Sequence, residues 1–370
     1  MIQLHHGDCL DILPTLEAGS IDAIVTDPPY GLKFMSKSWD HGVPGAPFWQ
    51  AALRVLKPGG YLLAFGGTRT FHRQVCAIED AGFKITDCIN TLAWTYGSGF
   101  PKGKGQLKPS FEPITLARKP GGKVLALGID ECRVGTSKRV PGGIPSQAPN
   151  RIYGKASVRH DDEEGRDPNI GRWPPNTVLI HHPACNGVCH PDCHVRGFPG
   201  SDRIETRTEI ITRNVRGSHE VYGEFAKIVN TPTHPDSGSA ARFFPQFYYC
   251  GKASRRERNE GLEGMEERIA SPIGNDLSDN ESGNKNATRP RANTNPCVKP
   301  LALLQWLIKL VAREGETVLD MFAGSGSTGV ACVMEGRSFV GIEKEAEYHE
   351  IMRRRIDHAA NETPLFASAD

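Results

Sequence analysis

The chain has 370 residues, with 44 Lys and Arg against 43 Asp and Glu and a formal net charge of +1. This length allows one large domain or two ordinary ones, and the balanced charge means that any basic surface must be local. No apolar run approaches a membrane span, and the start MIQLHHGDCL lacks the features of a signal peptide. Most of the ten cysteines are scattered singly, which is typical of reduced thiols in a cytoplasmic protein.

The first 120 residues alternate between strand-like and helix-like segments. IQLHHGD and SIDAIVTD predict short strands, and PFWQAALRVLKPGG predicts a helix that ends at Gly59-Gly60. Further strands are expected at GGYLLAFGG, CINTLAWTYG and EPITLARKP, with a helix over residues 68–82. This alternation is typical of a parallel sheet covered by helices.

The rhythm breaks at about residue 120 and returns near residue 300. Residues 121–292 are rich in Gly, Pro, Asn and Arg, and SPIGNDLSDNESGNKNATRPRANTNP predicts a flexible polar segment. Pro300 is expected to open the helix LALLQWLIKLVAR. TVLDMFAGSGSTG then predicts a strand, a glycine loop and a helix start, and SFVGIE a strand followed by a helix to about residue 360. The sequence therefore predicts one α/β domain supplied by both ends of the chain, with an irregular insert.

The tetrapeptide Asp27-Pro28-Pro29-Tyr30 ends the strand SIDAIVTD. Its prolines donate no N–H and fix φ, so the chain leaves the sheet stiff and extended. A carboxylate and free carbonyls beside an aromatic ring predict a site for a flat ring that carries N–H donors. Taken alone, Asp27 is as consistent with a turn or cap acid, and Tyr30 with a packed aromatic.

The segment Asp320–Gly329 predicts a second site, because its glycines lie between a strand and a helix. Glycines let a ligand approach the backbone, and the helix N-terminus offers free N–H groups. Glu343 ends the next strand, where a carboxylate can accept both hydroxyls of a ribose. The loop fits the fingerprint GxGxxG, but too little chain follows it for a second nucleotide-binding half. Hydride transfer also has no use for Asp-Pro-Pro-Tyr, which argues against a nicotinamide enzyme.

Together with GSGFPKGKGQLKPSFEPITLARKP, NTNPCVKPLALLQWLIKLV and GIEKEAEY, these motifs resemble the permuted, β-type DNA amino-methyltransferases of phages and bacterial modification systems. The resemblance implies a circularly permuted, doubly wound, mostly parallel Rossmann-like α/β fold. It implies S-adenosylmethionine as cofactor, double-stranded DNA as partner and a cytoplasmic location, with a homodimer left open. It divides the chain into a catalytic half at 1–120, an inserted target-recognition region at 121–292, a cofactor-binding half at 293–360 and a tail at 361–370.

Site residues follow from the resemblance by position. Asp27, Pro28, Pro29 and Tyr30 match the family's catalytic tetrapeptide. The implied cofactor-binding residues are Asp8, Lys299, Asp320, Phe322, Gly324, Ser325, Gly326 and Glu343. Asp8 matches an acid beside the cofactor's adenine, Glu343 the ribose acid, and Lys299 the segment leading to the helix beside the methionine moiety. Asn295-Pro296-Cys297 departs from the family's His-Pro-Thr, which leaves Asn295 and Cys297 without an assigned role.

The chemistry expected of this site is positioning of an amino group. An exocyclic amine is a poor nucleophile because its lone pair is delocalised into the ring. Hydrogen bonds to the Asp27 carboxylate and the Pro28 carbonyl would push the nitrogen toward tetrahedral geometry, while Tyr30 stacks on a flipped base.

Other methyl acceptors, and a DNA-binding protein without catalytic activity, are the alternatives to this function. By family habit, Asp at position 27 favours adenine N6, with cytosine N4 and a non-catalytic DNA-binding protein as alternatives. Methylation of cytosine C5 needs a thiolate nucleophile. Cys297 precedes the Lys-Pro helix and does not lie beside the Asp-Pro-Pro-Tyr strand end, which argues against that mechanism. Asp27 and the size of the inserted region argue against an enzyme that methylates amides of protein or RNA.

Two basic runs are candidates for contacts with DNA phosphates. The first run, GSGFPKGKGQLKPS, contains Lys102, Lys104 and Lys108. The second run, GKASRRERNEG, contains Lys252, Arg255, Arg256 and Arg258. The alternative for each run is an ordinary solvated surface.

The segment HHPACNGVCHPDCHV is dense in soft metal ligands, namely Cys185, Cys189, Cys193, His181, His182, His190 and His194. A structural zinc could pin an insert that has little core. Three-residue gaps are looser than a CxxC pair, so free thiols and surface histidines are the default and no metal is predicted, with zinc left open.

Overall fold

The computed structural model describes residues 1–32, 40, 42–92, 111–134, 173–181, 185, 188–191, 193–198, 200–201, 238–247, 255–268 and 291–362. In these ranges, a nine-stranded sheet has the order β1-β11-β10-β2-β3-β5-β4-β6-β9. Its strands are β1 (Ile2–His6), β2 (Ile21–Thr26), β3 (Leu56–Phe65), β4 (Lys84–Leu92), β5 (Glu112–Arg118), β6 (Thr177–Ile180), β9 (Gln246–Phe247), β10 (Thr317–Asp320) and β11 (Ser338–Glu343). A separate short pair joins β7 (Gly200–Ser201) to β8 (Gly238–Ser239).

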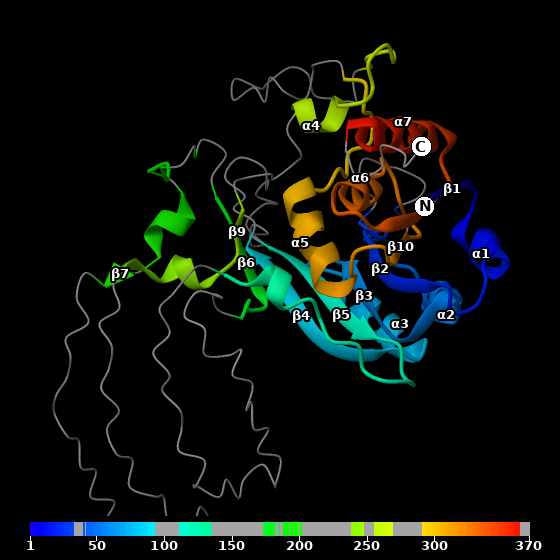
Figure 1. The fold of residues 1–370 in the computed structure, drawn as a ribbon, viewed down its shortest axis with the longest axis horizontal. Coiled ribbons are helices and arrows are strands. Elements are labelled where there is room, and N and C mark those ends of the chain that lie inside the picture. The colour runs from blue at the N-terminus through cyan, green and yellow to red at the C-terminus, as the bar shows by residue number, and fades with distance from the viewer. Residues whose placement is uncertain are drawn as a thin grey trace, which may run out of the picture.

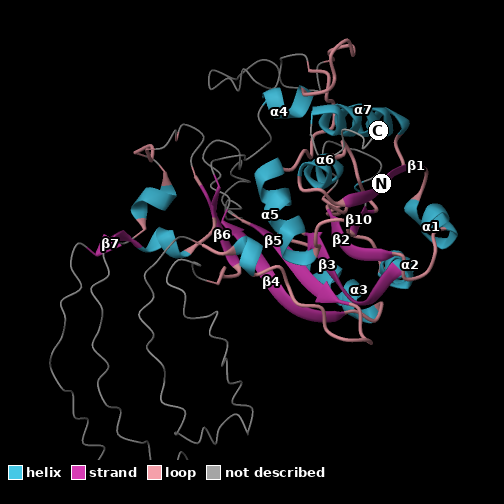
Figure 2. Ribbon diagram, viewed as in Figure 1, coloured by secondary structure: helices cyan, strands magenta, loops and turns pink. Residues whose placement is uncertain are grey.

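Helices cover both faces of the central sheet (Figures 1 and 2). The helices are α1 (Cys9–Ile12), α2 (Ala46–Val55), α3 (Phe71–Asp80), α4 (Arg255–Asn259), α5 (Leu301–Val311), α6 (Ser327–Met334) and α7 (Ala346–Glu362). One core packs α5, α6 and α7 against side chains such as Val25 and Leu63. The other packs α1, α2 and α3 against their strand neighbours Ile24 and Leu62. Alternate residues of one strand therefore enter opposite cores, as expected for a sheet buried on both faces.

The two ends of the chain meet in the sheet, as the permuted motif order predicts. β1 pairs in parallel with β11, with Ile2 opposite Phe339 and His6 opposite Glu343. β11 continues in parallel through β10 to β2. The mostly parallel, permuted α/β fold is therefore confirmed. β2, which leads to Asp27, and β10, which leads to the glycine loop, are neighbours although they lie near opposite ends of the sequence.

One strand departs from the parallel arrangement. β5 runs antiparallel to both of its neighbours, β3 and β4, while the other pairings in this sheet are parallel. The apolar run of EPITLARKP identifies a buried strand but carries no information about its direction. The sequence therefore predicted the strand and not its orientation.

The end of α2 differs from the sequence prediction. The helix stops at Val55 and β3 begins at Leu56, so Gly59-Gly60 lies within a strand. A Cβ at Gly60 would lie 2.7 Å from the carbonyl oxygen of Asp22 in β2, and Gly59 has a φ of +83°. Gly60 thus permits a close backbone approach between β2 and β3, Gly59 supplies a left-handed conformation, and the helix end depends on neither.

The described parts of residues 121–292 attach to the domain at three places. The Gly128 amide donates to the Leu310 carbonyl and the Cys132 thiol to the Trp306 carbonyl, both in α5. β6 and β9 extend the sheet beyond β4. Leu262 and Met265, which follow α4, pack against Tyr348 and Ile351 of α7. The division at residues 120 and 292 stays a prediction, and residues 363–370, most of the predicted tail, lie outside the described residues.

The structure describes part of the second basic run and none of the lysines of the first. Lys102, Lys104, Lys108 and Lys252 lie outside the described residues. Arg258 is buried and donates to the carbonyl of Pro296, so it is not available to a phosphate, whereas Arg256 is exposed.

Of the helices in the described ranges, none has the length and apolar character needed to cross a membrane.

Candidate active site at the carboxyl ends of the strands

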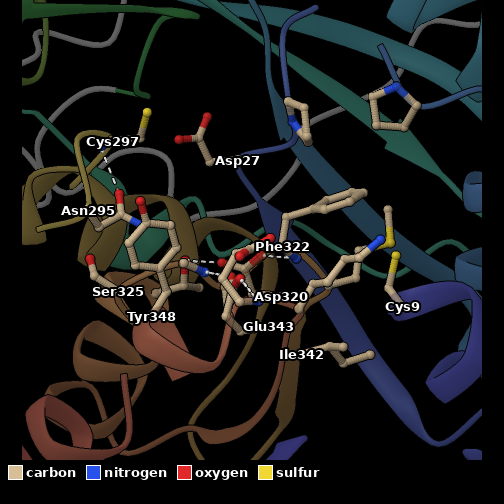
Figure 3. Close-up of a pocket in the computed structure, with 18 of the residues that line it drawn as sticks. Cys9, Asp27, Asn295, Cys297, Asp320, Phe322, Ser325, Ile342, Glu343 and Tyr348 are labelled. Atoms are coloured by element: carbon tan, nitrogen blue, oxygen red, sulfur yellow. Dashed lines mark hydrogen bonds between the residues drawn. The ribbon is translucent and has the colours of Figure 1, made fainter. Parts of the chain in front are cut away.

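A cavity of about 430 Å³ opens where β1, β2, β10 and β11 end. Nearly all the predicted site residues lie on its walls, namely Asp8, Asp27, Pro29, Lys299, Asp320, Phe322, Gly324, Ser325 and Glu343. Pro28, Tyr30 and Gly326 are not among the lining residues. Figure 3 shows Asp27 and Cys297 toward one end, Cys9 and Ile342 toward the other, and Glu343 with Phe322 between them. Ligands bind at this edge of parallel sheets because the strand ends leave a crevice there.

The Asp-Pro-Pro-Tyr corner is held by its own hydrogen bonds. The Tyr30 hydroxyl donates to Asp27 Oδ1 at 2.7 Å. Immediately after the corner, the amides of Gly31 and Leu32 donate to the two carboxylate oxygens of the buried Asp40. Burial and the adjacent Asp27 carboxylate raise the pKa of Tyr30 well above its ordinary value, so the phenol stays a donor at neutral pH.

Lys299 reaches Asp27 from the segment before α5. Its Nζ lies 2.6 Å from Asp27 Oδ2 and 3.5 Å from Glu112 Oε2. Both side chains of the first pair are largely buried, at 14% and 18% exposed. Burial alone would lower the pKa of Lys299, but Asp27 and Glu112 outweigh it and the net pKa is raised. The cofactor-binding role that the resemblance implies for Lys299 stays a prediction; in the structure its ammonium lines the cavity and balances the charge of Asp27.

Asp320 ties the two predicted halves of the site together. Its Oδ1 accepts from Thr26 Oγ1 at 2.6 Å, at the end of β2, and from the Phe322 amide at 3.1 Å. Its Oδ2 accepts from Thr328 Oγ1 at 2.7 Å, in the first turn of α6. Burial raises the pKa of Asp320 to about 6, although these three donors lower it. The carboxylate thus joins the strand before Asp27 to the glycine loop and to the helix that follows it.

The glycines of the loop serve the packing of the protein itself. Gly324 and Gly326 have φ values of +54° and +78°, which favour glycine. A Cβ at Gly326 would lie 2.7 Å from Met352 Cγ, and one at Gly329 would lie 2.3 Å from Ile356 Cδ1, both in α7. Gly326 and Gly329 therefore let α6 pack against α7, and of the three fingerprint glycines only Gly324 lines the cavity.

The buried Arg355 is a support for this loop that the sequence did not reveal. Its guanidinium donates from α7 to the Ser325 carbonyl at 2.7 Å, to the Ser325 and Ser327 hydroxyls, and to the Glu257 carbonyl in α4. A single cation therefore links the loop, α7 and α4. An Arg inside an amphipathic helix carries no sequence signal for such a role.

Glu343 and Asp8, two further acids of the cavity, are partly engaged by the backbone. Glu343 accepts from the amides of Gly324 at 2.7 Å and Glu345 at 2.8 Å, and burial raises its pKa. Asp8 caps α1 by accepting from the Leu10 amide, which lowers its pKa, and pairs with Lys344 at 2.9 Å. Both carboxylates nevertheless line the cavity and have further lone pairs to offer a ligand.

Several wall residues were not singled out from the sequence. Phe48 faces Phe322 with ring centroids 6.1 Å apart, and Tyr348 lies by Glu343. Asn295 is buried on the wall, where its Oδ1 accepts from the Cys297 amide and shapes the departing segment. Phe48 and Tyr348 belong to helical patterns that predict packing, so only the tertiary structure places them here.

Comparison with known proteins identifies a family. A family model described as DNA methylase matches residues 21–354. The type II methyltransferase M.Cfr9I of Citrobacter freundii is 33% identical over 355 residues, which is 95% of this chain and 87% of that protein. The type II methyltransferase M.BglI of Bacillus subtilis is 50% identical over 58 residues, so the match spans 16% of this chain and only 17% of that relative. The solved PvuII DNA methyltransferase, described as cytosine-N4-specific, aligns over 96% of this chain and 86% of that chain, with a TM-score of 0.46 and 14% identity.

Proposed function

This chain belongs to the DNA methylase family, and on that basis we propose that it methylates the N6 amino group of a flipped adenine in double-stranded DNA, using S-adenosylmethionine. One observation carries the proposal. Asp27 and the loop from Asp320 to Ser325 line the same cavity, and the Thr26–Asp320 hydrogen bond holds their strand ends together. This shared cavity supports the proposal, because a carboxylate that can accept from an amine and a glycine loop that can hold a nucleoside cofactor both line it.

The walls of the cavity suit S-adenosylmethionine. Glu343 is a buried carboxylate that can accept from ribose hydroxyls, and Asp8 is a second acceptor nearby. Phe322 and Phe48 offer apolar ring surface to an adenine. A cavity of about 430 Å³ lies within the usual range of about 300–1,000 Å³ for small-molecule sites. When bound, the cofactor supplies an electrophilic methyl group on a positively charged sulfur.

Asp27 is the proposed catalytic residue. Its carboxylate would accept one N–H of the target amine, which helps to localise the lone pair on nitrogen. The Pro28 carbonyl as acceptor of the other N–H stays a prediction, because Pro28 is not among the residues that line the cavity. Each oxygen of Asp27 already accepts one hydrogen bond, from Tyr30 or from Lys299, and each has a second lone pair. Lys299 and Tyr30 would act as positioning residues that fix the rotamer of Asp27. The stacking role of Tyr30 stays a prediction.

The choice of adenine rests on Asp27, since Asp at this position favours adenine by family habit. Transfer of a labelled methyl group from S-adenosylmethionine to DNA, followed by nucleoside analysis, tests the proposal. We expect N6-methyladenine. N4-methylcytosine would keep the mechanism and overturn the base. Cofactor binding without transfer to any DNA would support a non-catalytic DNA-binding protein.

The remaining parts of the proposal concern the partner and the setting. We place target recognition within residues 121–292 and the enzyme in the cytoplasm, where a modification enzyme meets its DNA. A homodimer is included as one assembly to be measured by light scattering with and without DNA. A single species at the mass of one chain in both conditions would exclude it.

A further inference from the structure

A cluster of four soft ligands lies at the far edge of the sheet, away from the cavity. His181 follows β6 directly, Cys185 and Cys189 lie in the next loop, and Cys193 precedes the short turn at His194–Gly197. The nitrogen of His181 and the three sulfurs all lie within 4.8 Å of one another. His181 and Cys193 are buried, and the other two cysteines are partly buried. From these positions we propose that His181, Cys185, Cys189 and Cys193 bind one structural Zn²⁺.

The spacing of the ligand atoms matches a tetrahedral zinc site. Zinc bonds of about 2.3 Å to sulfur and about 2.0 Å to nitrogen place tetrahedral S and N ligands about 3.5 Å apart. His181 Nδ1 lies 3.4 Å from Cys189 Sγ and 3.7 Å from Cys193 Sγ. Three thiolates and one imidazole form a closed Cys₃His set, which is typical of structural zinc. Zinc binding would release the three thiol protons.

The neighbours of His181 orient its ring for this role. Gln246 Nε2 donates to the Ala241 carbonyl at 2.7 Å, which turns Gln246 Oε1 toward His181. Oε1 lies 3.0 Å from His181 Nε2 and can only accept, so Nε2 carries the proton. In the neutral ring, the lone pair is then on Nδ1, the atom that faces Cys189 and Cys193. A metal-binding histidine is commonly fixed by such a hydrogen bond on its other nitrogen.

The sulfurs and the backbone are also arranged as a metal site requires. The His190 amide donates to Cys185 Sγ at 3.2 Å, which fixes the position of that sulfur. The His181 amide donates to the Phe247 carbonyl, so the same residue joins β6 to β9. Among the residues that the structure describes, the core around the cluster has four buried members, Leu179, Cys193, Val195 and Ala241. A zinc ion would supply the stability that so small a core lacks.

Metal analysis of the full-length protein, purified after expression with zinc, tests the site. We expect about one zinc per chain, and its release when a thiol reagent is added, read with a chromogenic chelator. Cys189→Ser and His181→Ala should lose the zinc, and His181→Cys should keep it. Cys76→Ser, an exposed thiol on α3, is the matched control and should match the wild type.

A graded test separates ligation from folding. Gln246→Ala should keep one zinc per chain but weaken the affinity for Zn²⁺ about 10- to 100-fold, because the ring loses its orienting acceptor. Gln246→Glu keeps an acceptor and should restore the affinity. Cobalt-loaded wild type should show the intense visible bands of tetrahedral Co²⁺ and a sulfur-to-metal charge-transfer band. A metal-free wild type, disulfides within the cluster seen by intact mass, or zinc retained in Cys189→Ser would overturn the proposal.

Discussion

The two edges of the sheet are built in different ways. At the cavity, β1, β11, β10 and β2 are flanked by two large apolar cores, and every predicted acid is held by donors from the protein. At the far edge, the described residues around β6 and β9 form a core with four buried members beside a cluster of soft ligands. Packing therefore presets the geometry of the cavity, whereas the far edge depends on side-chain chemistry that a metal can complete. Changes at the cavity and removal of metal at the far edge should therefore have separate effects.

Removal of Asp27 should have the largest effect. Asp27→Ala should lower the rate of methyl transfer by about 100- to 1,000-fold, because the amine loses its charged acceptor. Cofactor affinity should change little, because the cofactor is assigned to Asp8, Phe322 and Glu343. Asp27 lies toward the end of the cavity opposite Cys9 and Ile342. Single-turnover transfer and calorimetric binding measure the two quantities. Asp80→Ala, at the exposed end of α3, is the control, and full turnover by Asp27→Ala would remove Asp27 from the mechanism.

Asp320 should make the cavity edge sensitive to pH. Its pKa of about 6 is above the ordinary 3.8, so the folded state holds this proton more tightly than the unfolded state. The stability that this proton contributes is present below pH 4 and is lost as the pH rises through 6, by about 3 kcal/mol.

Urea unfolding at several pH values compares the wild type with Asp320→Asn, which cannot titrate. The stability of the wild type relative to the variant should fall between pH 4 and 6. A constant difference across this range would show that Asp320 has an ordinary pKa in the folded protein.

Removal of metal should affect only the far edge. If zinc is present at 100 times its dissociation constant, chelation would cost about 2.7 kcal/mol, or about 100-fold in local opening. Hydrogen exchange should accelerate at the amides of Leu179 and His181, which bond to β9, and stay slow at Val318 and Leu319 in β10. Equal acceleration at both edges would show that they unfold as one unit.

Glu343 should have the smallest effect. Glu343→Gln keeps the size of the side chain but removes the charge offered to ribose hydroxyls, so the cofactor dissociation constant should rise about 10-fold. Transfer at saturating cofactor should be nearly unchanged. Glu350→Gln, on the exposed side of α7, is the control. Unchanged affinity for S-adenosylmethionine in Glu343→Gln would rule out its assignment as the ribose acid.

The sequence predicted the cavity better than it predicted its supports. The resemblance to permuted enzymes indicated that both ends of the chain would share one fold and that Asp27 and Phe322 would belong to one site, and the structure brings them to one cavity. The direction of β5 was not predictable, because apolar pattern does not encode strand direction. The roles of Lys299 and Arg355 depend on contacts between distant segments, which local spacing does not reveal. The looseness of the Cys spacing likewise hid how closely the four ligands converge.

The central claim is that one cavity presents the amine acceptor Asp27 to a cofactor held by the glycine loop and Glu343. A crystal structure with S-adenosylmethionine or its demethylated product tests this most directly. We expect the ribose at Glu343, the adenine between Asp8 and Phe322, and the sulfur turned toward Asp27. A cofactor bound outside this cavity, or with its sulfur turned away from Asp27, would contradict it.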